Sequence, residues 1–250
     1  MLLELRQVSR SFGGLAAVKR VDLAVGAGEI VGLIGPNGAG KTTLFNLISG
    51  AYRPNSGSIH FDGRDITGLP PHVRCKLGVA RTFQLVRPFP NLTVLENVAV
   101  GSVYGREAAP SRRLAETAAY DTLRVLGLQE RAHQPARSLT LVDRKRLELA
   151  RALATHPVLL LLDELLAGLN PSEVISALDL VRRVRDSGVT IVMVEHLVKA
   201  LFGISDRVAV LSAGEKLCEG TPEQVAQDPR VVDAYLGTAR TDEAEALTLA

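Results

Sequence analysis

Several residue types are scarce in this sequence, and each scarcity argues against a class of protein. Tryptophan is absent, aromatic residues make up 4% of the chain, and there are two cysteines, Cys75 and Cys218. The cysteines lie far apart and outside any C-x-x-C pair, so we expect neither a disulfide scaffold nor a zinc ribbon. This sparse use of cysteine favours a reducing, cytoplasmic setting.

Charge of one sign and long apolar runs are also lacking. The 29 basic residues nearly balance the 27 acidic ones, and a net charge of +2 is too small for a broad nucleic-acid surface. The longest aliphatic run, 158–162, is far shorter than the roughly 20 residues of a membrane span. Glu4 and Arg6 interrupt the start of the sequence, so we expect no signal peptide. We therefore expect any link to a membrane to go through a partner.

What is present is the composition of a globular α/β protein with a substantial core: 250 residues, 46% hydrophobic and 22% charged. Apolar alternation and short apolar runs predict strands over 2–8, 18–25, 29–34, 58–61, 158–162 and 189–194. Helical spacing predicts helices over 42–49, 114–126, 144–154 and 173–186. Segments 208–211 and 215–218 predict a hairpin around Ala213 and Gly214. Alternating strands and helices favour parallel strands joined by right-handed crossovers.

A glycine-rich segment, GPNGAGKT at 35–42, matches the pattern G-x-x-x-x-G-K-[ST] between a predicted strand and a predicted helix. Glycines let successive N–H groups turn toward phosphate, and the helix N-terminus favours an anion. Lys41 can reach the β- and γ-phosphates, and the Thr42 hydroxyl can ligate Mg²⁺. The alternative, a chance glycine-rich turn, does not account for this context. The predicted phosphate-binding residues are Gly35, Pro36, Asn37, Gly38, Ala39, Gly40, Lys41, Thr42 and Thr43.

Two carboxylates at the end of an apolar run predict the other half of the site. Asp163 follows the strand predicted over 158–162, at the sheet edge where open α/β sheets bind ligands. There its carboxylate can hold Mg²⁺, usually through water. Glu164 comes next and is the candidate to polarise an attacking water. The alternative is a buried strand that ends in two solvated acids.

Five further phrases carry a family resemblance. They are SFGGLAAVKRVDL at 11–23, ARTFQ at 80–84, NLTVLENV at 91–98, LDELLAGLNPSE at 162–173 and EGTPEQVAQDPRVVDAYLG at 219–237. With the two motifs above, the chain resembles an ATP-binding cassette ATPase, and more narrowly the LivG-type ATPases of branched-chain amino acid importers. The resemblance implies a P-loop NTPase fold with a RecA-like mixed sheet core, an antiparallel β subdomain and a helical signature subdomain. It implies a cassette over 1–237, with the helical subdomain at about 87–155 and a short tail at 238–250.

The resemblance also implies roles for single residues. Phe12 matches the aromatic residue that stacks on adenine; the alternative is an ordinary core phenylalanine. Gln84 matches the glutamine that reaches Mg²⁺ or the lytic water and senses the membrane subunit. His196 matches the histidine that contacts the γ-phosphate and orients the water. Lys41, Gln84, Glu164 and His196 are thus the implied catalytic set, and Thr42, Gln84 and Asp163 the implied metal ligands.

The family signature, LSGGQ, is altered here. The aligned residues are Leu139, Thr140, Leu141, Val142 and Asp143. Both glycines are lost, although bare backbone is what lets the signature approach the γ-phosphate of a partner's ATP. Asp143 adds negative charge near that anion unless it caps a helix that begins at Arg144. The hypothesis is that the ATP site completed by this segment is the weaker of two. We expect the basic run 144–146 to be a solvated helix start rather than a nucleic-acid contact.

Taken together, the resemblance implies an ATPase that binds ATP and Mg²⁺ and powers uptake of branched-chain or related amino acids. Its implied partners are a second cassette ATPase, in a heterodimer, membrane permease subunits and, indirectly, a solute-binding protein, with no nucleic acid. Its implied place is peripheral, on the cytoplasmic face of a bacterial inner membrane. Two alternatives stay open: a non-hydrolysing or asymmetric regulatory subunit, and an importer ATPase for another small polar solute such as urea or an amide. A soluble cassette protein of translation or DNA repair is disfavoured, because such proteins usually carry two cassettes or long insertions.

Overall fold

The computed structural model describes residues 1–84 and 88–236, and the chain divides into two compact units. Unit 1 comprises Met1–Pro71 and the chain from Val181 onward, and unit 2 comprises His72–Leu180. The predicted subdomain and tail boundaries stay predictions, and the tail at 238–250 lies outside the described residues.

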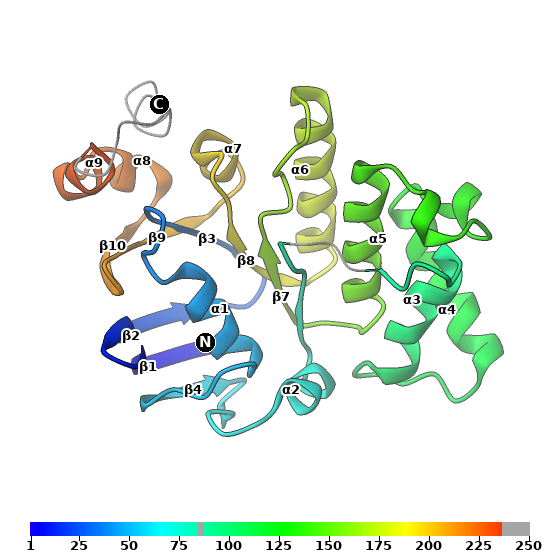
Figure 1. The fold of residues 1–250 in the computed structure, drawn as a ribbon, viewed down its shortest axis with the longest axis horizontal. Helices are drawn as coiled ribbons and strands as arrows, with labels where there is room; N and C mark the ends of the chain where they lie inside the picture. Colours follow the sequence, from blue (N-terminus) through cyan, green and yellow to red (C-terminus); the bar gives the residue numbers. More distant parts are fainter. Residues whose placement is uncertain (85–87, 237–250) are drawn as a thin grey trace. The chain divides into compact units, whose positions relative to one another are not determined.

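Unit 1 contains an antiparallel sheet with the strand order β2-β1-β4-β5. Its strands are β1 (Leu3–Phe12), β2 (Leu15–Val25), β4 (Ser56–Phe61) and β5 (Arg64–Asp65). The alternation seen in the sequence has a clear cause, since Leu3, Leu5 and Val8 of β1 are buried while the residues between them are more exposed. Figure 1 shows β1, β2 and β4 side by side, in blue and cyan.

Unit 1 also contains parallel strands. Strand β3 (Ile30–Ile34) pairs in parallel with β8 (Thr190–Val194) and β9 (Arg207–Ser212), and β9 pairs antiparallel with β10 (Glu215–Gly220). Every residue of β3 and β8 is buried, as expected for strands covered on both faces. The helices of this unit are α1 (Lys41–Ser49), α7 (Val198–Phe202), α8 (Pro222–Ala226) and α9 (Pro229–Leu236). The predicted hairpin is confirmed, and its turn residues Ala213 and Gly214 both have positive φ, 50° and 86°.

Unit 2 is mainly helical. Its helices are α2 (Pro71–Leu77), α3 (Val94–Tyr104), α4 (Arg112–Val125) and α5 (Leu141–Leu153), with short 3₁₀ turns η1 (Gln129–Arg131) and η2 (Ala136–Ser138). Helix α3 packs against α4 and α5, as the green helices of Figure 1 show. Strand β6 (Val79–Arg81) pairs in parallel with β7 (Leu159–Asp163). Helix α6 (Pro171–Asp186) begins in unit 2 and ends in unit 1.

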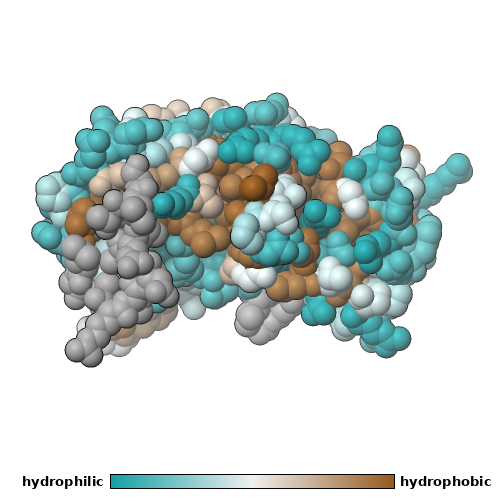
Figure 2. Space-filling model, turned by 90° about the horizontal axis from the view of Figure 1, so that it is seen from above, coloured by the Kyte–Doolittle hydropathy of each residue, from teal (hydrophilic) through white to brown (hydrophobic). Residues whose placement is uncertain are grey.

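Apolar residues are also present at the surface. On the face drawn in Figure 2 they lie between hydrophilic ones, and exposed large apolar side chains include Tyr104, Leu114 and Val125 of α3 and α4. Among residues 1–84 and 88–236, no helix has the length and apolar character needed to cross a membrane.

Candidate nucleotide site

The phosphate loop has the geometry that its sequence predicts. Strand β3 leads into residues 35–40, and α1 begins at Lys41. The Lys41 side chain is buried, and its Nζ donates to the backbone carbonyls of Gly35 and, at 3.1 Å, of Pro36. Helix α1 has no side-chain cap and no acidic residue in its first turn. Its N-terminus therefore combines a helix dipole with a lysine in a first turn that contains no acidic residue, which suits a phosphate group.

Two glycines of this loop are required by close backbone contacts. A Cβ on Gly35 would lie 2.1 Å from the Leu211 carbonyl oxygen, and a Cβ on Gly40 would lie 2.3 Å from that of Ala17. Both glycines also have positive φ, 151° and 103°. The loop therefore depends on the absence of side chains at these positions.

His196 lies at the same edge of the unit 1 sheet as the phosphate loop. Leu33 of β3 is paired with Val194 of the parallel strand β8, so the residues that follow both strands emerge at one edge. The His196 side chain is exposed there, as is Leu197. This placement is compatible with a polar group directed toward a bound phosphate.

Phe12 ends β1 and is not a core residue, since it is 39% exposed. Its ring makes an edge contact with Tyr52, with the centroids 5.2 Å apart. The Arg10 guanidinium lies 4.8 Å from the Phe12 centroid and 5.6 Å from that of Tyr52. A guanidinium on a ring face is a cation–π contact, which orients the ring. The alternative of an ordinary core phenylalanine is therefore wrong.

In unit 2, Asp163 is the last residue of β7 and its side chain is 2% exposed. Arg81 of β6 donates from an η nitrogen to Asp163 Oδ2 at 2.7 Å. The Asp163 N–H donates to the Thr82 hydroxyl at 3.1 Å. The alternative of a solvated acid is wrong for Asp163, because its carboxylate is buried and paired with Arg81.

Glu164 and Gln84, which are 80 positions apart in the sequence, lie in contact. Gln84 Nε2 donates to Glu164 Oε2 at 2.7 Å. The Glu164 backbone has φ of 51°, a left-handed conformation that is uncommon for a residue with a side chain. Unit 2 therefore brings Gln84, Asp163 and Glu164 together at the end of β7.

The start of the signature helix differs from the expectation. Helix α5 begins at Leu141 with Thr140 as its N-cap, so the interpretation of Asp143 as the cap of a helix beginning at Arg144 is wrong. Thr140 is extended, with φ −64° and ψ 168°, and its hydroxyl accepts the Asp143 N–H at 3.3 Å. The buried Asp143 carboxylate accepts from the Thr140 hydroxyl at 2.9 Å and pairs with Arg131 Nε at 3.2 Å.

Sequence reasoning missed three residues that support the unit 2 cluster. Arg81 lies within the quoted phrase ARTFQ but was given no role, and it pairs with Asp163. Lys145 was expected in a solvated helix start, which is wrong, because it is 7% exposed and bonds to carbonyls after β7. Glu148, also buried, accepts the Phe83 N–H at 2.7 Å. The missed signal was helical periodicity, since Lys145 and Glu148 share the apolar face of α5 with Leu149.

In unit 1 a strand, a glycine loop and a helix surround a buried lysine, and in unit 2 strand β7 ends in Asp163 and is followed by Glu164. These features define a P-loop nucleotide-binding protein. The family model described as ABC transporter matches residues 18–167, and the one described as branched-chain amino acid ATP-binding cassette transporter matches 215–241. The chain therefore belongs to the ATP-binding cassette family of ABC transporters.

Curated relatives agree over almost the whole chain. The high-affinity branched-chain amino acid transport ATP-binding protein LivG of Escherichia coli K12 is 43% identical, over 95% of this chain and 98% of that protein. The corresponding protein BraF of Pseudomonas aeruginosa is 41% identical over the same shares.

Solved structures confirm the predicted cassette fold. A nucleotide-free ATP-binding cassette from an ABC transporter matches with a TM-score of 0.87 and 29% identity, over 94% of this chain and 98% of that one. The ADP conformation of an ATP-binding cassette of an ABC transporter matches with a TM-score of 0.85, 29% identity and the same coverage.

Proposed function

We propose that this chain is the ATP-hydrolysing subunit of an importer for branched-chain or related amino acids. The observation that carries hydrolysis is the contact between Gln84 and Glu164 directly after the buried Asp163, in a chain with a complete phosphate loop. The solute is proposed from the names of the relatives LivG and BraF and from the family match at 215–241.

Mg²⁺ is the metal that this proposal implies. The oxygens of Thr42, Gln84 and Asp163 are hard donors of the kind that Mg²⁺ prefers. The residues described in the two units contain no group of three or more His, Cys, Asp or Glu arranged to hold a metal. The proposed ion would be held by the Asp163 carboxylate together with nucleotide phosphates and water. When bound, Mg²⁺ neutralises charge on the transferred phosphoryl group.

The protein's own groups have separate tasks in this proposal. Lys41 and the N–H groups of the loop bind the phosphates, and Phe12 stacks on the adenine. Glu164 accepts a proton from the attacking water, and Gln84 orients that water beside it. His196 donates a hydrogen bond to a γ-phosphate oxygen. Electrostatic stabilisation by groups already in position supplies the largest part of such catalysis.

The proposed assembly is a heterodimer with a second cassette, in which each ATP lies between one chain's phosphate loop and the other chain's signature. We expect the α5 N-terminus of this chain to bind an anion weakly, because Leu141 and Val142 cover backbone that glycine would expose. ATP binding then favours the closed dimer, and hydrolysis reopens it.

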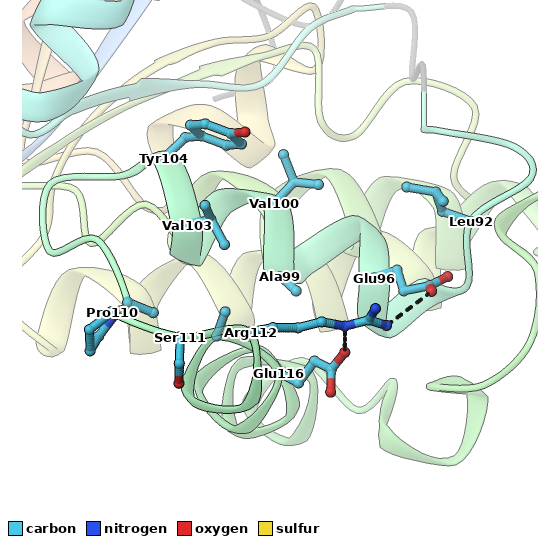
Figure 3. A pocket seen from close by; sticks show the side chains of 12 residues that line it. Leu92, Glu96, Ala99, Val100, Val103, Tyr104, Pro110, Ser111, Arg112 and Glu116 are labelled. Carbon is cyan, nitrogen blue, oxygen red and sulfur yellow. Dashed lines mark hydrogen bonds and ion pairs between the residues drawn. The ribbon is translucent and has the colours of Figure 1, made fainter.

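The permease is proposed to contact the segment 84–98, of which 85–87 lie outside the described residues. This segment leads into α3, where residues of α3, of α4 and of the loop between them line a hollow of about 530 Å³ (Figure 3). Val100, Val103 and the 69%-exposed Tyr104 lie along it, and Arg112 bridges Glu96 and Glu116 at its edge. We place this surface against the permease at the cytoplasmic face of the membrane, and expect Tyr104→Asp to reduce copurification of the permease.

Calorimetry and hydrolysis test the nucleotide function. Mg-ATP is expected to bind the wild-type chain and to lose detectable heat with Lys41→Ala, whereas Lys76→Ala, at an exposed lysine of α2, binds normally. Glu164→Gln is expected to bind Mg-ATP but to hydrolyse it at least a hundredfold more slowly in the complex with its partners. Wild-type hydrolysis by Glu164→Gln would exclude Glu164 as the base.

Transport tests the solute. The native complex, purified through a tag on this chain and reconstituted in vesicles, is expected to take up leucine in an ATP-dependent way. Uptake of urea without leucine would replace the amino-acid assignment while leaving the ATPase assignment intact.

A further inference from the structure

Two charged side chains of α5 are buried although burial of charge is costly. Lys145 is 7% exposed and Glu148 is 8% exposed. They are three residues apart on one helix, so they lie on the same face. A charged side chain in such a position needs hydrogen bonds to be stable. The hydrogen-bond partners of Lys145 and Glu148 therefore indicate the role of this face of α5.

Lys145 holds the backbone directly after β7. Its Nζ donates to the carbonyl oxygens of Glu164 and Leu165, each at 2.9 Å. Glu164 is the residue whose backbone has the left-handed φ of 51°. Two consecutive carbonyls bound to one ammonium restrain the peptide that follows Glu164, and they thereby restrain the backbone from which its side chain projects.

Glu148 holds the backbone directly before Gln84. Its Oε1 accepts the Phe83 N–H at 2.7 Å. The Gln84 side chain in turn donates to Glu164 Oε2 at 2.7 Å. Lys145 and Glu148 therefore reach, from one helix face, the backbones of both members of the Gln84–Glu164 pair.

We propose that Lys145 and Glu148 are positioning residues for ATP hydrolysis, which hold Glu164 and Gln84 in register from a single face of α5. This inference rests on the proposed role of Glu164 as the base. Helix α5 begins within the altered signature segment, so these two side chains link that segment to both members of the pair.

The principal test is Lys145→Met, which keeps an unbranched apolar stem of about the same length and removes the ammonium donors. In the complex with partners, kcat for Mg-ATP is expected to fall about tenfold while KM and the Kd of Mg-ATP change less than twofold. Lys145→Arg, which restores donors, is expected to recover at least half of kcat. The control Arg146→Met changes a neighbouring basic residue of α5 and is expected to keep wild-type kcat.

Substitutions at Glu148 test the same proposal independently. Glu148→Gln keeps an oxygen that accepts the Phe83 N–H, so kcat is expected to stay within about twofold of wild type, whereas Glu148→Leu loses most of it. Gln84→Ala combined with Lys145→Met is expected to lose less than the product of the two single losses, because both act through Glu164.

The outcomes separate this inference from the proposed function. If Glu164→Gln is inactive but Lys145→Met and Glu148→Leu keep wild-type kcat, the positioning role is wrong and the base assignment stands. A loss of kcat by Lys145→Met that Lys145→Arg does not recover also contradicts it. If Lys145→Met does not fold, Glu148→Leu against Glu148→Gln decides the question. If Glu164→Gln itself hydrolyses ATP at the wild-type rate, the proposed role of Glu164 as the base is wrong, and the positioning role that rests on it is wrong as well.

Discussion

At the scale of single residues, the candidate site depends on a few side chains and on two glycines, Gly35 and Gly40, at which a side chain would clash with backbone. The local motifs could be read from the sequence because each one is contiguous: the glycine loop with its lysine at 35–42, and the two acids at 163–164 after an apolar run. The partners of those residues could not. Arg81 pairs with Asp163 from 82 positions away, and Gln84 reaches Glu164 from 80 positions away. Only the folded chain brings such pairs into contact.

Phe12 gives the first prediction at this scale. Stacking of a base on an aromatic side chain contributes about 1–3 kcal/mol, so Phe12→Ala is expected to raise the Kd of Mg-ATP about tenfold. Phe12→Tyr keeps the ring and is expected to bind nearly as well as wild type. The control is Phe89→Ala in unit 2, at a similarly exposed phenylalanine. Fluorescence titration with a labelled ATP analogue measures the four affinities, and unchanged binding by Phe12→Ala would remove Phe12 from the site.

Alanine substitutions at Gly40 and Gly38 distinguish the cost of a steric clash from the cost of an unfavourable backbone dihedral angle. Both have positive φ, 103° and 78°, but a Cβ would meet Ala17 O at 2.3 Å only at Gly40 and nothing within 4 Å at Gly38. Gly38→Ala is expected to cost about 1 kcal/mol in the free energy of unfolding. Gly40→Ala is expected to cost at least about 2 kcal/mol more, because backbone must move. Urea unfolding of the nucleotide-free chain measures both, and equal costs would contradict the clash.

At the scale of elements, helices and strands with clear periodicity were predicted and others were missed. Helices α1, α4 and α6 and strands β3, β7 and β8 match predicted segments within a few residues. Helix α3 was missed because its sequence, VLENVAVGSVY, is apolar on more than one face and so lacks a clear helical period. Its start could have been predicted from the capping box formed by Thr93 and Glu96. Strand β6, at three residues, is too short to show a period. The start of α5 was misplaced because Thr140 and Asp143 both have capping side chains.

The buried face of α5 predicts a pH dependence of stability. Burial raises the pKa of Glu148 above its usual 4.5, an effect that the Phe83 N–H, Arg151 and Lys145 oppose and that Asp163 adds to. Because the folded pKa is the higher one, the contribution of Glu148 to stability is fully present below the unfolded pKa and is lost as pH rises through the folded pKa.

Glu148→Gln removes this titration. The free energy of unfolding of Glu148→Gln minus that of wild type is therefore expected to rise with pH across that window and then to level off. Glu130→Gln, at an exposed glutamate of η1, is the control and is expected to show a smaller change. Urea unfolding at several pH values measures the differences. A difference for Glu148→Gln that falls with pH would show that the folded pKa is not raised.

At the scale of the whole molecule, the altered signature bears on which of the two ATP sites in a cassette dimer hydrolyses ATP faster. The chain retains a complete phosphate loop and the Asp163–Glu164 pair, but its own α5 start carries Leu141, Val142 and a buried Asp143. In the proposed heterodimer, one ATP would lie on this chain's loop and a partner's signature. The other ATP would lie on the partner's loop and segment 139–143 of this chain. An anion at the second site meets the side chains of Leu141 and Val142 where the family signature has glycines, so that site is expected to be the slower one.

Inactivating one site at a time tests this asymmetry. Glu164→Gln in this chain removes the site on its own loop and is expected to lower single-turnover hydrolysis by the heterodimer to about a tenth or less. The corresponding substitution in the partner removes only the slower site and is expected to leave at least half. Replacing Leu141 and Val142 by glycine in the Glu164→Gln chain is expected to restore part of the lost rate, although two glycines in the first turn of α5 cost about 1–2 kcal/mol of stability. Equal losses from the two glutamate substitutions would mean that both sites hydrolyse ATP alike and that the segment 139–143 forms a competent signature despite its side chains.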